Sequence, residues 1–79
     1  MNPGNVIKKL TTGHSASAQN MRNLLACCEH SSREQIARKA AEARKESDNF
    51  CRHSAWTMHV LKCEADLMEA YLASTGADQ

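Results

Sequence analysis

No glycine or proline occurs between Gly13 and Gly76 of this 79-residue chain, and this absence constrains the fold more than any other feature. Glycine and proline are the residues that most often interrupt helices and strands. The uninterrupted stretch is rich in Ala, Leu, Met, Glu, Lys, Arg and Gln, which lose the least conformational freedom on entering a helix. The sequence therefore predicts an all-α protein, and its length predicts a single domain over residues 1–79.

Capping residues divide the chain into four expected helices. Asn2, followed by proline, is typical of a helix start. Two overlapping capping boxes mark the start of the third helix: Ser31 with Glu34, and Ser32 with Gln35. Because one helix begins so soon after another ends, we expect the second and third helices to form an antiparallel hairpin. The expected helices cover residues 2–12, 15–30, 32–47 and 48–74.

Residues 47–49, with the sequence Ser-Asp-Asn, leave two architectures open. All three residue types are favourable at helix ends, so the chain can turn there and fold back into a three- or four-helix bundle. The apolar stripe of the third helix nevertheless stays in phase across them, from Ile36 to Leu72. That continuity favours one helix over about residues 32–73, continuous with the charged helix before it. Such a helix extends beyond its hairpin partner and has to dimerise.

The last expected helix is more apolar than one neighbouring helix can cover. Residues 50–72 carry two adjacent apolar stripes, and this width implies packing on two sides. Only three residues of the chain are aromatic, so the core is thin, and chains of this size often gain stability from a metal or a second copy. Glu64 interrupts the arc, where a carboxylate is costly unless it is paired or reaches water. We expect an interface formed by Trp56, Val60, Leu61, Leu67, Met68 and Tyr71.

The chain also contains four cysteines and four histidines. If it folds back near residue 48, the end of the second helix comes close to the middle of the last one. Thiolate and imidazole ligands in a tetrahedral set suit zinc. A zinc site is therefore one interpretation of Cys28, His30, His59 and Cys63. Buried thiols acting as small hydrophobic residues, and disulfides, are the alternatives.

Other classes of function find little support. The sequence lacks the His-Glu-x-x-His, Gly-rich phosphate-loop and Gly-x-Ser-x-Gly motifs, and a short bundle offers little concave volume for a small-molecule substrate. No apolar run of 18 residues could span a membrane, and the absence of a secretory signal favours a cytoplasmic location. The basic residues of the middle segment alternate with acidic ones, which is untypical of a phosphate-binding stripe. These basic residues are Arg33, Arg38, Lys39, Arg44, Lys45 and Arg52.

The charge of the chain is unevenly distributed, since residues 1–52 carry a net +4 and residues 53–79 a net −3. Such asymmetry can mark an interaction surface. In size and in its expected hairpin, the chain resembles small plasmid- or phage-encoded regulators such as the Rop dimer, although it shares no motif with them. We therefore expect a non-enzymatic helical protein that binds a protein partner or itself. The alternatives are a zinc-binding module and a nucleic-acid-binding regulator.

Overall fold

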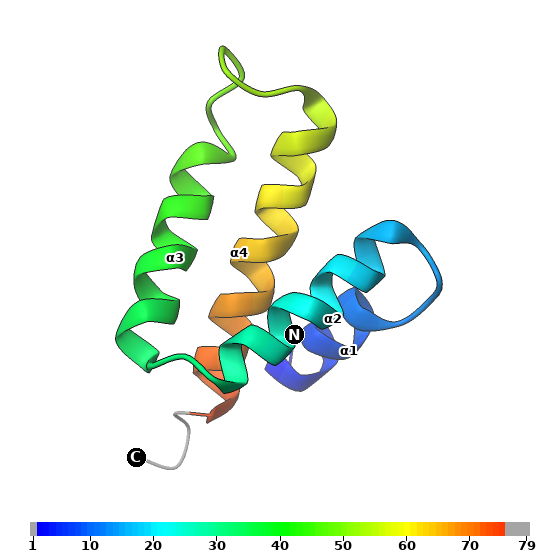
Figure 1. The fold of residues 1–79 in the computed structure, drawn as a ribbon, viewed down its shortest axis with the longest axis vertical. Helices are drawn as coiled ribbons and strands as arrows, with labels where there is room; N and C mark the ends of the chain where they lie inside the picture. Colours follow the sequence, from blue (N-terminus) through cyan, green and yellow to red (C-terminus); the bar gives the residue numbers. More distant parts are fainter. Residues whose placement is uncertain (1, 76–79) are drawn as a thin grey trace.

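The computed structural model describes residues 2–75, and within that range the chain is all-helical, as predicted. Its helices are α1 (Pro3–Thr11), α2 (Ala16–Glu29), α3 (Arg33–Glu46) and α4 (Ala55–Thr75). No strand occurs among the described residues. Figure 1 shows α3 and α4 running side by side in opposite directions, with α1 and α2 lying against the other side of α4.

Each of the first three helices begins where a polar side chain caps it. The Asn2 side chain accepts a hydrogen bond from the Gly4 backbone N–H at 2.8 Å, and Ser15 accepts one from Ala18 at 3.0 Å. At α3 the capping box is reciprocal: the Gln35 N–H donates to Ser32 at 3.1 Å, and the Gln35 side chain accepts from the Ser32 N–H at 3.1 Å. These bonds satisfy backbone donors that have no partner inside the helix.

Gly13 permits the turn between α1 and α2. Its φ angle of 110° lies in a region that side-chain-bearing residues rarely adopt. The Arg22 guanidinium closes the same turn, because it donates to the carbonyl oxygens of Thr11 and Gly13, each at 2.8 Å. The first helix is thereby held against the second.

Helix α3 ends at Glu46 and the chain folds back, so the bundle alternative is confirmed and the alternative of one continuous helix over about 32–73 is wrong. Backbone bonds from Asp48 to Lys45 and from Asn49 to Glu46 tighten the end of α3 into a turn. The last helix begins at Ala55 rather than near residue 48, because Ser54 caps it: the Thr57 N–H donates to the Ser54 hydroxyl at 3.2 Å. Residues 47–54 form the turn that reverses the chain.

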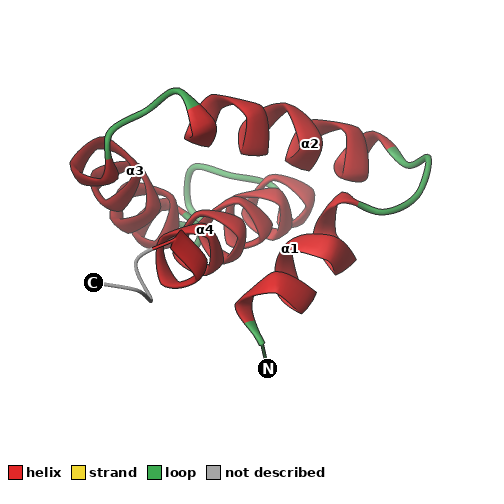
Figure 2. Cartoon of the chain, turned by 90° about the horizontal axis from the view of Figure 1, so that it is seen from below, coloured by secondary structure: helices red, strands yellow, loops and turns green. Residues whose placement is uncertain are grey.

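The prediction of an antiparallel hairpin between the second and third helices is also wrong. Figure 2 shows α2 crossing over α4, while α3 lies beside α4. The Ser31-Ser32 turn starts a new helix, but it does not fix the angle between the two axes. That angle follows from burial, because the buried residues of α2, which are Ala18, Met21 and Cys28, face inward over α4. The antiparallel pair is α3 with α4.

Small side chains make the core between α3 and α4. The central cluster comprises Cys28, Ile36, Ala40, Ala43, Ala65 and Met68, with Leu24, Leu61, Tyr71 and Leu72 packed around it. Alanines on both helices let the two backbones approach closely. An ion-pair network on the surface spans the same pair: the Arg44 guanidinium lies 2.8 Å from both Asp66 and Glu69. The last helix is thus the element against which the others pack.

Candidate interaction surface

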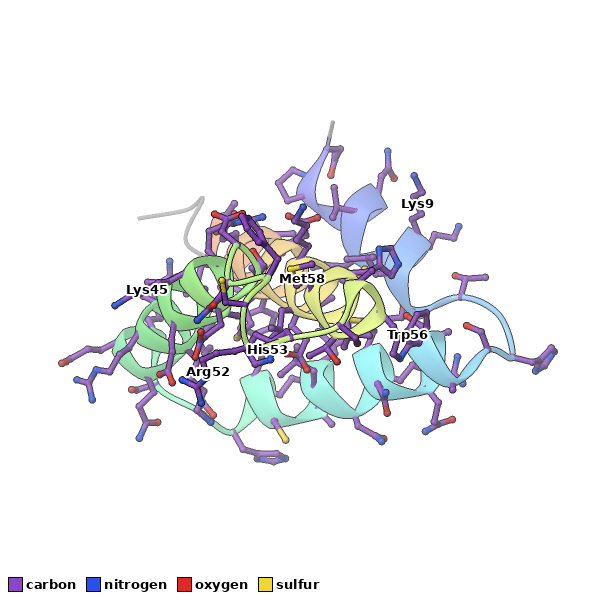
Figure 3. All side chains as sticks on the ribbon, turned by 90° about the horizontal axis from the view of Figure 1, so that it is seen from above. Lys9, Lys45, Arg52, His53, Trp56 and Met58 are labelled. Atoms are coloured by element: carbon purple, nitrogen blue, oxygen red, sulfur yellow. The ribbon has the colours of Figure 1, made fainter. Side chains whose placement is uncertain are left out.

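Two large apolar side chains remain exposed at the end of the molecule where α3 turns into α4. Phe50, in the turn, is 77% exposed, and Trp56, in the first turn of α4, is 60% exposed. We call these two residues the turn-end surface. Figure 3 looks onto this end and shows Trp56 on the opposite side of the molecule from Lys45 of α3. The Trp56 ring lies against the His59 ring, with centroids 5.9 Å apart.

The turn that carries Phe50 is held to α3 through one carboxylate. Glu46 lies 3.7 Å from both the Arg52 guanidinium and the His53 imidazole, and it accepts a hydrogen bond from Asn49 at 3.4 Å. Ser47 is almost completely buried, and its hydroxyl donates to the Arg44 carbonyl oxygen at 2.7 Å. The turn is therefore attached at several points while its aromatic residue faces solvent.

The six residues predicted to form an interface do not share one free surface. Leu67 and Met68 are buried in the core of the chain itself, with 0% and 4% exposure. Leu61 and Tyr71 pack against that core, and Val60 is half-buried. Only Trp56 is exposed. The apolar arc is wide because α1, α2 and α3 all pack against α4. Sequence periodicity alone does not reveal that these neighbours belong to the same chain.

Phe50 is the exposed residue that the sequence analysis did not single out. In the sequence, Phe50 continues the apolar stripe of the last expected helix, which includes residue 50. The signal that could have identified it is its position directly after Ser47-Asp48-Asn49, because a residue that follows three good capping residues is often in a turn. An aromatic residue in a turn has few neighbours to cover it.

The four residues predicted to bind zinc do not converge. Cys28 is 3% exposed, inside the α3–α4 core, and His30 is exposed at the C-terminal end of α2. His59 and Cys63 lie together on α4, with 3.7 Å between Nε2 and Sγ. Among the described residues, no three His, Cys, Asp or Glu side chains are grouped closely enough to hold a metal. The crossing of α2 over α4 separates the two halves of the expected set.

The cysteines of the described chain are all free thiols. Burial raises the pKa of Cys28, with a smaller contribution from Cys27. Burial also raises the pKa of Cys63, with smaller contributions from the charges of Asp66 and Glu64. Both thiols are therefore held in the protonated form, which is a poor nucleophile.

Two grooves flank the last helix. The first, of about 450 Å³, lies between α1 and α4 and is lined by Pro3, Val6, Lys9, Leu10, Asp66, Glu69 and Ala70. The second, of about 320 Å³, is lined by Leu24, Lys39, Glu42, Ala43, Glu46, Leu61, Glu64 and Met68. Burial in this second groove raises the pKa of Glu64.

All four arginines considered for nucleic-acid binding have partners within the chain. Arg44 bridges to α4, and Arg38 pairs with Glu34 at 3.0 Å. Arg33 donates to the Leu72 carbonyl and the Thr75 hydroxyl near the end of α4. Arg52 lies near Glu46. Lys39 lines the second groove, and Lys45 is exposed. Three of these basic residues, Arg38, Arg44 and Arg52, are thus paired with acidic side chains.

None of the helices described over residues 2–75 is both long and apolar enough to cross a membrane. Comparisons with protein-family models, curated proteins and solved structures found no match to this chain.

Proposed function

We propose that this protein is a non-enzymatic cytoplasmic binding module that contacts another protein, or a second copy of itself, through the turn-end surface of Phe50 and Trp56. The exposure of Trp56 carries this proposal. Burying a Phe-sized side chain is worth about 1.5–3 kcal/mol, and the fold leaves this gain unused at two aromatic positions. Aromatic residues of this kind are enriched among the residues that dominate binding energy.

A binding role is favoured over a catalytic one by the state of the thiols near histidine. A Cys–His nucleophile requires a thiolate, which a lowered pKa supplies. The pKa of Cys63, the cysteine in contact with His59, is raised instead. The raised pKa therefore favours a neutral thiol at Cys63.

Trp56 is the single tryptophan of the chain, so its fluorescence reports directly on the proposed surface. If the partner is a second copy, the fluorescence emission of Trp56 should shift to shorter wavelength as the protein concentration rises. The mass measured by light scattering should increase over the same range. Phe50→Ser should weaken this shift without removing the reporter, and Trp56→Ala should abolish the increase in mass. Arg38→Ala, an exposed change on α3, is the matched control and should leave both signals unchanged.

A foreign partner is tested by affinity capture with the same variants. A protein retained by the wild type and by Arg38→Ala, but lost by the Phe50→Ser and Trp56→Ala double variant, would support the proposal. Association or capture that survives the double variant would place the contact elsewhere on the molecule and contradict it.

A further inference from the structure

The strongest chemical feature outside the turn-end surface is the pair His59 and Cys63, one turn apart on α4. Their Nε2 and Sγ atoms are 3.7 Å apart. Zinc binds imidazole nitrogen at about 2.0–2.1 Å and thiolate sulfur at about 2.3 Å in a tetrahedron, which places two such ligand atoms roughly 3.6 Å apart. The pair therefore already has nearly the spacing of one edge of a zinc site.

The two side chains are also accessible and oriented. His59 is exposed and Cys63 is half-buried. The Trp56 ring packs against the His59 ring and limits the directions that the imidazole can take. Ligands that are held in place before the metal arrives bind it with a smaller entropic cost. Glu64 and Asp66 contribute negative charge near Cys63, although the Arg44 guanidinium offsets part of the charge of Asp66.

The described residues 2–75 of one chain supply only half of such a site. Within residues 2–75 no third His, Cys, Asp or Glu joins the pair closely enough to complete a metal group. Closed zinc sites have four protein ligands, and Cys₂His₂ is a common set. A second copy related by a twofold axis through the metal would supply the same two residues again. Two thiolates would also neutralise the charge of the ion.

We propose that His59 and Cys63 form a zinc half-site that the same pair of a second copy completes, so that one zinc ion joins two chains. This proposal uses Trp56 only to orient His59, and it does not require the turn-end surface to bind a partner. On zinc binding each thiol loses its proton to solvent, and no oxidation or reduction takes place.

The metal stoichiometry of the 79-residue chain tests the proposal. Native mass spectrometry with added zinc should show a dimer carrying one zinc ion, and a chelator should return it to monomer. Cobalt in place of zinc should give the intense sulfur-to-metal charge-transfer absorption and the visible bands of a tetrahedral thiolate site. One zinc per single chain, or no zinc binding, would overturn the proposal.

Variants identify the ligands. Cys63→Ser and His59→Ala should each abolish the zinc-dependent dimer and the cobalt spectrum, while circular dichroism confirms that the helices persist. Cys51→Ser and His14→Ala, at exposed positions elsewhere, are the matched controls and should retain both signals. A cobalt–thiolate spectrum that survives Cys63→Ser would contradict the assignment. A zinc dimer that persists in the Phe50→Ser variant would show that the metal site acts independently of the turn-end surface.

Discussion

At the scale of single residues, Glu64 shows how an acidic side chain among apolar ones becomes a source of instability. It lines the second groove together with Leu24 and Met68, and burial raises its pKa. Because the folded state disfavours the ionised carboxylate, Glu64 destabilises the fold at any pH above its folded pKa. The penalty disappears below the pKa of the unfolded chain, where the group is protonated in both states.

We expect Glu64→Gln to raise the melting temperature at pH 7, because the amide fills the same space without a charge. The gain should be only a few tenths of a kcal/mol, since water still reaches the groove and screens the group. Melting curves at pH 7 and near pH 3.5, recorded with chelator, check this: the gain should vanish at the acidic pH. Glu34→Gln should act in the opposite direction at pH 7, because it removes a carboxylate at the N-terminus of α3.

At the scale of the elements, the contact between α3 and α4 combines a small-residue core with one charged bridge. Arg44 reaches across from α3 to two carboxylates of α4, each at 2.8 Å. Networked arginine pairs contribute more than isolated exposed pairs do. The bridge thereby helps to fix the register of the two helices that the turn 47–54 connects.

Arg44→Met should therefore lower the free energy of unfolding by about 1 kcal/mol, since it leaves two neighbouring carboxylates without their cation. Urea denaturation checks the value. Arg38→Met removes an exposed pair within a single helix and should change stability little. Equal losses for the two variants would show that the bridge between helices has no special role.

Short sequence signals predicted most of the helices, because the contacts that start a helix are made between residues close in sequence. Asn2, Ser15 and Ser32 cap neighbouring backbone N–H groups, and the bonds involve residues at most three positions away. The break at 47–54 was harder to predict, because the apolar phase continues through it. The deciding contacts are a buried Ser47 and the capping Ser54, and the burial of Ser47 depends on the tertiary fold.

Of the candidate sites, the sequence predicted only the proximity of residues that lie on the same helix. The spacing of His59 and Cys63 guarantees that they share a face of α4, and the structure brings them together. Joining them to Cys28 and His30 required the angle of α2, which follows from packing and not from sequence spacing. Because this packing was not predictable, Leu67 and Met68 were expected at an interface with a partner. They are buried against other helices of the same chain.

At the scale of the whole molecule, α4 is the common neighbour of the other three described helices, whereas α3 packs closely only on α4. Leu67, completely buried on α4, is therefore a sensitive position. A chain of 79 residues has a total stability of roughly 4–12 kcal/mol, so the loss of one large core side chain takes a substantial part of it.

We expect Leu67→Ala to lower the free energy of unfolding by about 2–5 kcal/mol, through lost burial and the cavity left behind. Trp56→Ala, at the exposed end of the same helix, should change it by less than about 0.5 kcal/mol. Thermal and urea denaturation of the two variants separate core from surface. A large loss of stability in Trp56→Ala would instead make Trp56 part of the core.

The central position of α4 has a consequence for the order of events during protein synthesis. The ribosome releases α1, α2 and α3 before α4, so the first three helices emerge without the surface on which each of them packs. At about 5–20 residues per second, translation of the 21 residues of α4 takes roughly one to four seconds. During that interval Met21, Cys28 and Ile36 have no completed core in which to be buried.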